Sequence, residues 1–300
     1  MASLVRVSIT DMDYINTYIN ALDNSGDYSI NTLHAYTSDL KRFFNFFEKR
    51  ASQEGGKRTL NSKLIKDFLE HENKSGLSAS TIHRRKVVLG QFAQFLESIG
   101  ELPPDDVLDI LNWNHKLWKK IYERDIHHLS DDDLNKLFAV INAEESSKAV
   151  RDASLISMLL ETGLSIGKLI SIDLSDLDLE KARILVGSEE RTYSIEKSAE
   201  LLHKYLTVWR KEYTQASNEE ALFVSQMGGR ISRQGVWQLV KEWGEKAEIK
   251  APISPRVLRN TRAKKLVESG ETTEEIQKKL GHTNRHSTRS LVRKINRIAF

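Results

Sequence analysis

Helical periodicity is found in both halves of the chain, which are separated at Pro103–Pro104. Before this break, apolar residues recur every three or four positions in residues 29–50 and again in residues 76–100. After it, Ser130 marks a fresh helix start, because it precedes three aspartates and an apolar run. Two consecutive prolines interrupt a helix, and 300 residues suffice for two domains with separate cores. The chain is therefore expected to form two helical domains.

The domain boundaries follow from these signals. We place an N-terminal helical domain at residues 1–102, a linker at residues 103–128 and a C-terminal domain at residues 129–300. The linker is predicted to be partly helical and to bury aromatic residues such as Trp113 against one of the domains. In the C-terminal domain, residues 182–195 predict a β-hairpin. The predicted fold class is mainly α with a small β-sheet.

Composition excludes several kinds of chemistry. The chain has no cysteine, so disulfides, thiolate nucleophiles and cysteine-based metal sites are ruled out. Its nine histidines form no HExxH pair, and it contains neither a GxxxxGK[ST] nor a GxGxxG loop, so no metal or cofactor is expected. The first twenty residues show no basic segment followed by an apolar run, and no stretch reaches the length of a membrane span. We therefore expect a cytoplasmic protein without a membrane partner.

Positive charge is concentrated in two places, although the net charge of the chain is only +3. Residues 251–300 contain twelve Lys or Arg against four Glu and no Asp, a net charge of +8. A second basic run covers His83, Arg84, Arg85 and Lys86. One basic run alone is usually a solvated helix face, but two runs in different domains favour binding to nucleic acid.

Six sequence segments occur in a characteristic order along the chain. The first two are "NTLHAYTSDLKRFFNFF" and "GLSASTIHRRKVVLGQFAQFL", and the later ones are "HLSDDDLNKLF", "RDASLISMLLETGL", "LISIDLSDLDL" and "SPRVLRNTRAKKLVESGETTEEIQKKLGHTN". Their order and spacing resemble the tyrosine recombinase family, the phage integrases and Xer-type recombinases, over nearly the whole chain. The resemblance implies a SAM-like core-binding helical domain followed by a catalytic-type α+β domain. It also implies that double-stranded DNA is the partner.

The catalytic residues of that family are mostly replaced in this chain. In the family, a tyrosine attacks a DNA phosphodiester, two arginines and a histidine or tryptophan hold its oxygens, and a hairpin lysine acts as the general acid. Arginine suits this task because it offers two aligned donors and keeps its charge. By the resemblance, Arg259 and His282 survive as catalytic positions. The substituted positions are Ser165 for the first arginine, Ser188 for the lysine, Arg256 for a histidine and Leu291 for the nucleophile.

No neighbour obviously replaces the missing groups. The last tyrosine of the chain is Tyr213, far before Leu291, and the hydroxyls near Leu291 belong to serine and threonine, which are poorer leaving groups. The acidic residue expected three places after the first arginine is Lys168. Loss of a single donor to a developing oxyanion costs about 2.7–4 kcal/mol, so several losses together predict no useful rate of strand cleavage.

Three functions are consistent with the sequence. The first is a DNA-binding protein of this family, inactive in cleavage, that regulates recombination or integration or acts as an architectural DNA binder. The second is an active recombinase or strand-cleaving enzyme with a displaced nucleophile, and the third is a protein-interaction subunit with a vestigial DNA groove. Partners could include a second copy through the C-terminal segment, or an active recombinase. The expected DNA contacts are Arg84, Arg85, Lys86, Arg256, Arg259 and His282.

Overall fold

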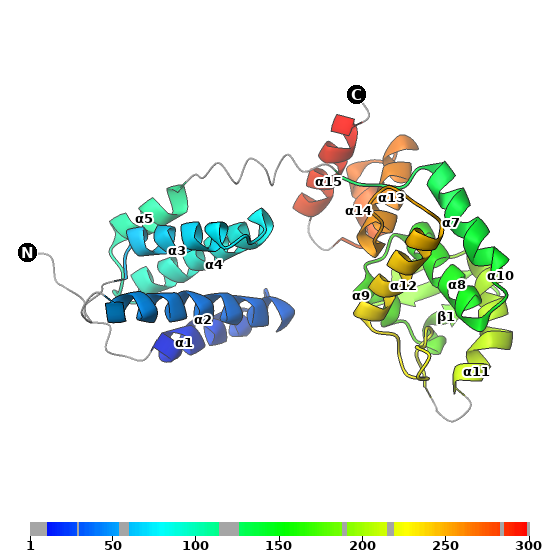
Figure 1. Ribbon diagram of the computed structural model, residues 1–300, viewed down its shortest axis with the longest axis horizontal. Helices are drawn as coiled ribbons and strands as arrows, with labels where there is room; N and C mark the ends of the chain where they lie inside the picture. Colours follow the sequence, from blue (N-terminus) through cyan, green and yellow to red (C-terminus); the bar gives the residue numbers. More distant parts are fainter. Residues whose placement is uncertain are drawn as a thin grey trace, which may run out of the picture. The chain divides into compact units, whose positions relative to one another are not determined.

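The computed structural model describes residues 11–28, 30–53, 60–113, 126–187, 191–214, 219–282 and 285–298. The chain divides into two compact units, Met1–Arg124 and Asp125–Phe300, and their boundary falls within the predicted linker (Figure 1). Each unit has a hydrophobic core of its own. The prediction of a mainly helical protein with a small β-sheet is confirmed.

The N-terminal unit packs its helices around an aromatic core. Its helices are α1 (Asp11–Ser25), α2 (Ile30–Gln53), α3 (Ser62–Lys74), α4 (Ala79–Ser98) and α5 (Pro104–Asn112). Apolar residues that recur at helical spacing along α2, such as Leu40 and Phe43, are buried as this spacing predicts. Phe43 makes an edge contact with Phe68 of α3, with 5.3 Å between the ring centroids. Phe92 of α4 contacts Phe44 from the other side at 5.9 Å. These aromatic contacts hold α2, α3 and α4 together.

The first residues of the predicted linker belong to this core. Pro103 precedes α5, and Pro104 is the first residue of this helix, a position where proline costs no hydrogen bond. Val107 and Ile110 of α5 are buried. Trp113 packs partly buried against the same cluster, as predicted for a linker aromatic. The N-terminal domain therefore extends beyond residue 102 and includes α5. Trp118 lies outside the described residues.

The C-terminal unit is built from short helices with well-defined ends. They are α7 (Asp131–Ala143), α8 (Ser147–Thr162), α9 (Ile166–Ile170), α10 (Ala199–Lys204), α11 (Arg210–Thr214), α12 (Arg233–Lys246), α13 (Pro255–Glu268), α14 (Thr273–Leu280) and α15 (Arg285–Ile298). A π-helical turn, Tyr205–Trp209, joins α10 to α11, and a 3-10 turn, Leu174–Asp176, precedes the sheet. The cap predicted at Ser130 is present, because its side chain and that of Asp133 bond reciprocally to backbone amides.

The sheet has three antiparallel strands, β1 (Leu177–Asp178), β2 (Arg183–Val186) and β3 (Arg191–Ser194), in the order β1-β2-β3. Ile184 pairs with Leu177 on one side and with Tyr193 on the other. The predicted hairpin between β2 and β3 is thus confirmed. Its turn residues 188–190, which include Ser188, lie outside the described residues.

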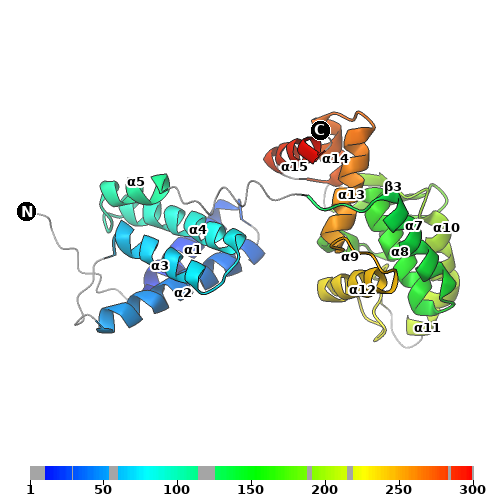
Figure 2. The same ribbon diagram turned by 45° about the horizontal axis from the view of Figure 1, so that its top comes forward.

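A buried polar contact fixes α12 against α8. Asp152 on α8 is fully buried and accepts a hydrogen bond from the indole Nε1 of Trp243 on α12 at 2.8 Å. Burial raises the pKa of Asp152, while the neighbouring Arg151 and the indole favour its charged form. A buried carboxylate needs such partners, so the two helices are held in one register. In both ribbon views α12 also lies beside α9 (Figures 1 and 2).

The last helix, α15, docks on its own chain. Ile295 is buried and Leu291 and Val292 are partly buried against Leu266 of α13 and Ile276 of α14. The apolar residues of this C-terminal segment are therefore covered in cis as far as they are described. Phe300 lies outside the described residues. None of the helices in the described part of the chain is long and apolar enough to cross a membrane.

Candidate active-site pocket

A pocket of about 510 Å³ opens between α9, the start of α12, α13, His282 in the segment after α14, and α15. It brings together five of the six family positions identified in the sequence, namely Ser165, Arg256, Arg259, His282 and Leu291. Its other lining residues are Leu164, Ile166, Gly167, Arg233, Pro255, Asn260 and Ser287. Three arginines therefore line this pocket, and no carboxylate is among its described lining residues.

Helix α13 supplies Arg256 and Arg259 from one face, because residues three apart on a helix are neighbours. The helix begins sharply: Pro255 occupies its first turn, and the Ser254 hydroxyl accepts a hydrogen bond from the Val257 amide at 3.3 Å. Arg256 is exposed at the pocket. Arg259 is half-buried and donates from Nη2 to the carbonyl oxygen of Leu280 at 3.0 Å, which leaves its other donors available.

The end of α14 places His282 in the pocket. Gly281 ends this helix in the left-handed conformation, with φ of 61°. A Cβ at Gly281 would lie 2.5 Å from the Tyr193 hydroxyl oxygen and 3.2 Å from Lys168 Nζ, so both the backbone angle and the packing require glycine. The His282 amide donates to the Gln277 carbonyl at 3.1 Å, which fixes the chain as it leaves the helix.

The His282 ring is held by a hydroxyl and surrounded by cations. Its Nδ1 lies 2.8 Å from Oγ1 of Thr288, a buried residue on α15. Burial, followed by the charges of Arg259 and Lys168, lowers the pKa of His282 from 6.5 to about 4. The ring is therefore neutral at pH 7. When Nδ1 accepts from Thr288, Nε2 carries the proton and can donate to an anion.

Ser165 and Lys168, predicted to stand where the family has an arginine and an acid, both serve the local fold. Ser165 caps α9, since its hydroxyl accepts a hydrogen bond from the Lys168 amide at 3.4 Å. The Lys168 ammonium donates to the Gly281 carbonyl at 3.1 Å, which ties α9 to the end of α14. An acid at 168 would lose this contact and would neutralise the pocket, whereas lysine adds positive charge.

Leu291, which the sequence predicts to stand at the nucleophile position, lines the pocket and packs in the small core below α15. The hydroxyl of Ser287 also lines the pocket, while that of Thr288 is committed to His282. One phenol lies near this site: Tyr193 of β3 borders a neighbouring pocket that also includes His282, but it is only 7% exposed. Among the described residues, no group of acidic or histidine side chains could hold a metal ion.

Arg233 is the one cation among the described lining residues of this pocket that the sequence did not lead us to predict. It is the first residue of α12, after the cap Ser232, and is exposed. No local pattern distinguishes it from other exposed arginines, because it reaches the pocket through the packing of α12 on α9. The signal that could have drawn attention to it is its position directly after a helix cap.

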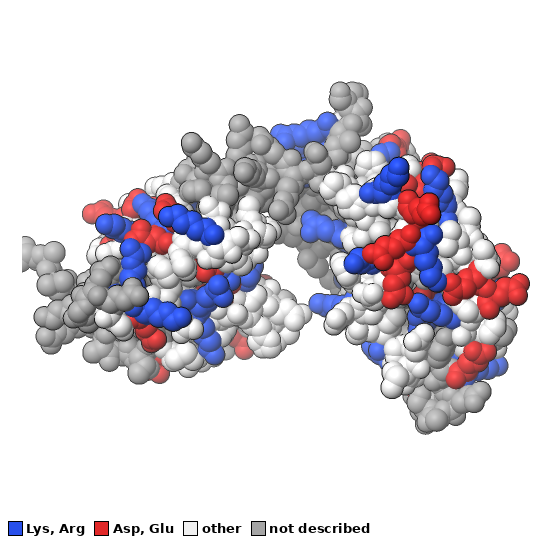
Figure 3. Space-filling view, in the orientation of Figure 1, with Lys and Arg blue, Asp and Glu red and all other residues white. Residues whose placement is uncertain are grey.

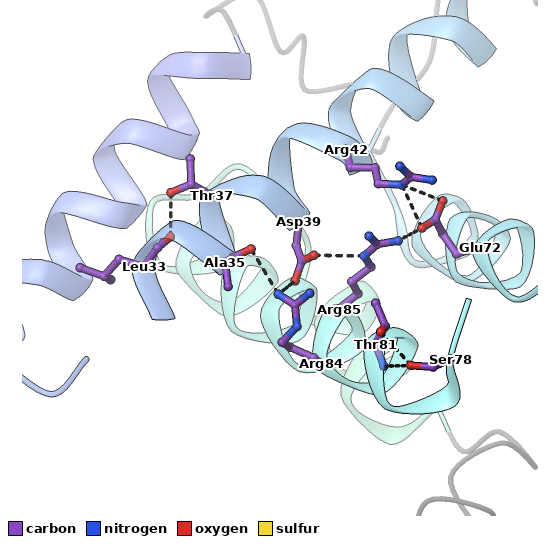
Figure 4. Close-up of polar contacts among 10 residues, drawn as sticks. All are labelled: Leu33, Ala35, Thr37, Asp39, Arg42, Glu72, Ser78, Thr81, Arg84 and Arg85. Atoms are coloured by element: carbon purple, nitrogen blue, oxygen red, sulfur yellow. Dashed lines mark hydrogen bonds and ion pairs between the residues drawn. The ribbon is translucent and has the colours of Figure 1, made fainter. Parts of the chain in front are cut away.

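The second predicted contact region, on α4, has a different environment (Figure 4). Two nearly buried carboxylates, Asp39 of α2 and Glu72 of α3, hold three arginines. Asp39 pairs with Arg84 and, at 3.1 Å, with Arg85 Nε. Glu72 pairs with Arg85 and, at 3.1 Å, with Arg42 Nε. We call these five side chains the α2–α4 ion-pair network.

This network changes the role expected of the basic run. The Arg85 side chain is 9% exposed between two carboxylates, and this environment favours a structural role over the DNA contact that the sequence predicted for it. Lys86 donates to the Leu111 carbonyl at 2.9 Å and ties α4 to the end of α5. Arg84 is 41% exposed in its side chain but is paired with Asp39 and bonded to the Ala35 carbonyl. The basic run can be recognised in the sequence, but its acidic partners cannot, because they come from other helices.

Comparison with known proteins agrees with this architecture. Residues 127–294 match the model of the phage integrase family, and residues 15–100 match its N-terminal SAM-like domain. The chain is 25% identical to the tyrosine recombinase XerD of Staphylococcus epidermidis strain RP62A over 296 residues, covering 94% of this chain and 96% of that protein. It is 27% identical to XerD of Staphylococcus aureus strain Mu50 over 295 residues, with the same coverage.

Solved structures of the same fold include the XerH site-specific recombinase bound to difH substrate in a post-cleavage complex. That structure has a TM-score of 0.70 and 17% identity, over 99% of this chain and 90% of that one. A λ integrase dimer bound to a COC' core site has a TM-score of 0.65 and 18% identity, over 94% of each chain. Fold and matched residues define an integrase-type, two-domain recombinase architecture. The chain belongs to the phage integrase family and is homologous to the XerD tyrosine recombinases.

Proposed function

We propose that this protein binds double-stranded DNA and does not cleave it. The observation that carries the proposal is the composition of the pocket, where Leu291 stands at the nucleophile position among Arg233, Arg256 and Arg259. Such a site can hold a phosphate but has no tyrosine to attack it. A protein of this kind could occupy a recombination site, regulate an active recombinase or act as an architectural binder.

The electrostatics of the pocket support anion binding. Guanidinium groups keep their charge and bind phosphate oxygens through paired donors. Burial lowers the pKa of Arg259, and the charge of Arg256 lowers it further, so an anion between the two would relieve this repulsion. In Figure 3, Lys and Arg side chains reach the edge of the C-terminal unit where α9, α13 and α15 lie.

In the N-terminal unit, the surface best suited to contact DNA lies on α2. His34, Thr37, Ser38, Lys41, Arg42 and Asn45 line a shallow hollow along one face of this helix. Arg42 is 54% exposed in its side chain and is oriented by Glu72, so it can reach a phosphate while remaining paired. We therefore assign phosphate contacts of this unit to Lys41 and Arg42, with Arg84 at the border of the ion-pair network.

A binding titration on mixed-sequence duplex DNA at several salt concentrations tests the proposal. If Z phosphates are neutralised, the logarithm of affinity falls with the logarithm of salt concentration with a slope of about −0.9Z. We expect a steep loss, with a slope of roughly −3 or beyond for contacts from both units. Absence of binding at low salt would reject DNA binding and favour the protein-interaction subunit.

A second experiment addresses cleavage. A nicked duplex that traps covalent protein–DNA products is incubated with wild type and with Leu291→Tyr, and adducts that survive boiling in detergent are scored. We expect none from the wild type. We also expect none from Leu291→Tyr, because Ser165 and Ser188 leave the first arginine and general-acid positions without their family residues. A wild-type adduct that disappears in Tyr193→Phe would instead identify a displaced nucleophile.

A further inference from the structure

Arg233 and Gly167 form a contact that bears on the lost first arginine. A Cβ built at Gly167 would lie 2.7 Å from Arg233 Nη2, 3.3 Å from Cζ and 3.4 Å from Nε. The Arg233 guanidinium therefore rests on the backbone of α9 at Gly167, two residues after Ser165. Only a residue without a side chain at position 167 leaves it this room.

Arg233 forms part of the pocket wall close to Ser165, the position predicted for the first arginine of the family. Gly167 and Ser165 both line the pocket, as does Arg233 itself. Arg256 and Arg259 come from α13, whereas Arg233 comes from the start of α12 and approaches across α9. The cations thus reach the pocket from two different helices, which is the arrangement needed to hold a tetrahedral anion from more than one side.

The contacts of α12 with the rest of the unit fix the position of the Arg233 backbone. The indole of Trp243 is bonded to the buried Asp152, and the Ser232 hydroxyl caps the helix by accepting from the Gly235 amide at 3.0 Å. The start of the helix is therefore held at a fixed place on the unit. Among the described residues, the Arg233 side chain has no ion-pair or hydrogen-bond partner, so its donors are available.

We infer that Arg233 takes over the phosphate contact that position 165 no longer provides, and that Gly167 creates its seat. The ligand is one phosphate of a DNA strand, held by Arg233, Arg256 and Arg259 with neutral His282 as a further donor. This inference rests on the proposed function and specifies which residues carry it. It assigns Arg233 a binding role and no part in bond cleavage.

The test uses two variants that disturb Arg233 in different ways. Arg233→Gln removes its charge, and Gly167→Ala displaces the guanidinium without changing the charge of the protein. Because the displaced atoms are the end of a flexible side chain and Gly167 lies in a helix, the alanine is expected to leave the fold intact. Duplex affinity is measured against salt concentration for the full chain, and thermal unfolding checks the fold of every variant.

We expect Arg233→Gln to weaken binding about tenfold at low salt and to reduce the magnitude of the salt slope by about 1. Gly167→Ala should weaken it about threefold, a smaller loss because the cation is moved and not removed. Two matched controls should bind as wild type. They are Gly229→Ala, where the nearest atom to a new Cβ is 3.9 Å away, and Lys136→Gln, which removes an exposed charge from α7.

Three results would overturn the inference, and they differ from each other. If Arg256→Gln weakens binding while Arg233→Gln and Gly167→Ala do not, Arg233 has no role in the site. If Arg233→Gln weakens binding but Gly167→Ala does not, the contact of Arg233 lies outside this pocket. If the wild type itself does not bind duplex DNA, the proposed function fails and the inference falls with it.

Discussion

The two arginine clusters of this protein have opposite electrostatic environments. On α4, Arg84 and Arg85 meet carboxylates from α2 and α3, and the network with Arg42 is largely neutralised inside the N-terminal unit. In the C-terminal pocket, arginines from α12 and α13 meet no carboxylate among the described lining residues. The charge of the first cluster is mostly paired within the fold, and only its partly exposed members Arg42 and Arg84 can also reach a ligand, whereas the second cluster retains a charge that only a ligand can neutralise.

The comparison shows what makes a basic run available to DNA. A buried charge must be paired, because desolvation without a partner costs several kcal/mol. Asp39 and Glu72 are buried together with Arg85, so their pairing is structural. Arg256 and Arg233 are exposed and stay solvated until an anion arrives. Availability therefore depends on the nearest carboxylates, which lie far away in the sequence.

The largest expected effect comes from breaking the α2–α4 ion-pair network. Arg85→Ala leaves Asp39 and Glu72 without their central partner, and we expect it to lower the free energy of unfolding by about 3–5 kcal/mol. Urea unfolding followed by circular dichroism measures this loss. The control is Arg50→Ala, which breaks a partly exposed pair with Asp67 and should cost no more than about 1 kcal/mol. Equal losses in the two variants would contradict the assigned role of Arg85.

The next prediction concerns a smaller effect, the loss of duplex affinity when one arginine of each cluster is replaced. We expect Arg256→Gln to weaken duplex binding about tenfold and to lower the magnitude of the salt slope by about 1, because an exposed phosphate contact is lost. Arg84→Gln should weaken binding by at most about threefold, since Arg84 is already paired with Asp39. Fluorescence anisotropy with a labelled duplex measures both variants. If Arg84→Gln has the larger effect, the contrast between the clusters is wrong.

The pH dependence of stability reports the burial of His282 and the positive charge around it. The pKa of His282 is lowered in the folded protein from 6.5 to about 4, so the unfolded chain binds more protons between these values. The contribution of His282 to stability is complete above pH 6.5 and is lost as the pH falls toward 4. Discounted for partial exposure, we expect a loss of about 1–2 kcal/mol.

His282→Gln isolates this contribution, because glutamine does not titrate. Unfolding free energies of the wild type and the variant are compared from pH 7 to pH 4. The difference between the two proteins should change over that interval, with the wild type losing more stability on acidification. Parallel curves would mean that neither burial nor the surrounding cations lower the pKa of His282 in the folded protein.

The smallest expected effect lies on the outer face of α15. Arg293 and Arg297 are exposed on this helix, which contains no acidic residue. Because neither lines the pocket and exposed charges are screened by salt, Arg297→Gln should change duplex affinity by less than about threefold. The same anisotropy titration measures it. A tenfold loss would extend the DNA surface from the pocket along α15.

Much of the fold could be predicted because its signals are local. The buried stripe of α2 follows from helical spacing, and the cap at Ser130 needs only a hydroxyl followed three residues later by an acid. The hairpin of β2 and β3 follows from two short strand patterns around Gly187. The end of the N-terminal domain was harder to predict, because α5 joins that core through Val107 and Ile110 after a proline pair that suggests a linker.

The sequence by itself determined the family and the order of the two domains, because motif order and spacing are properties of the chain, and it predicted that Ser165, Arg256, Arg259, His282 and Leu291 stand at family catalytic positions. Only the tertiary structure decided which cations are available. It buried Arg85 between Asp39 and Glu72, and it brought Arg233 over Gly167 into the pocket. The physical reason is that the energy of a charge depends on its solvation and on the charges within a few ångströms of it, and helix packing brings those neighbours from distant parts of the chain.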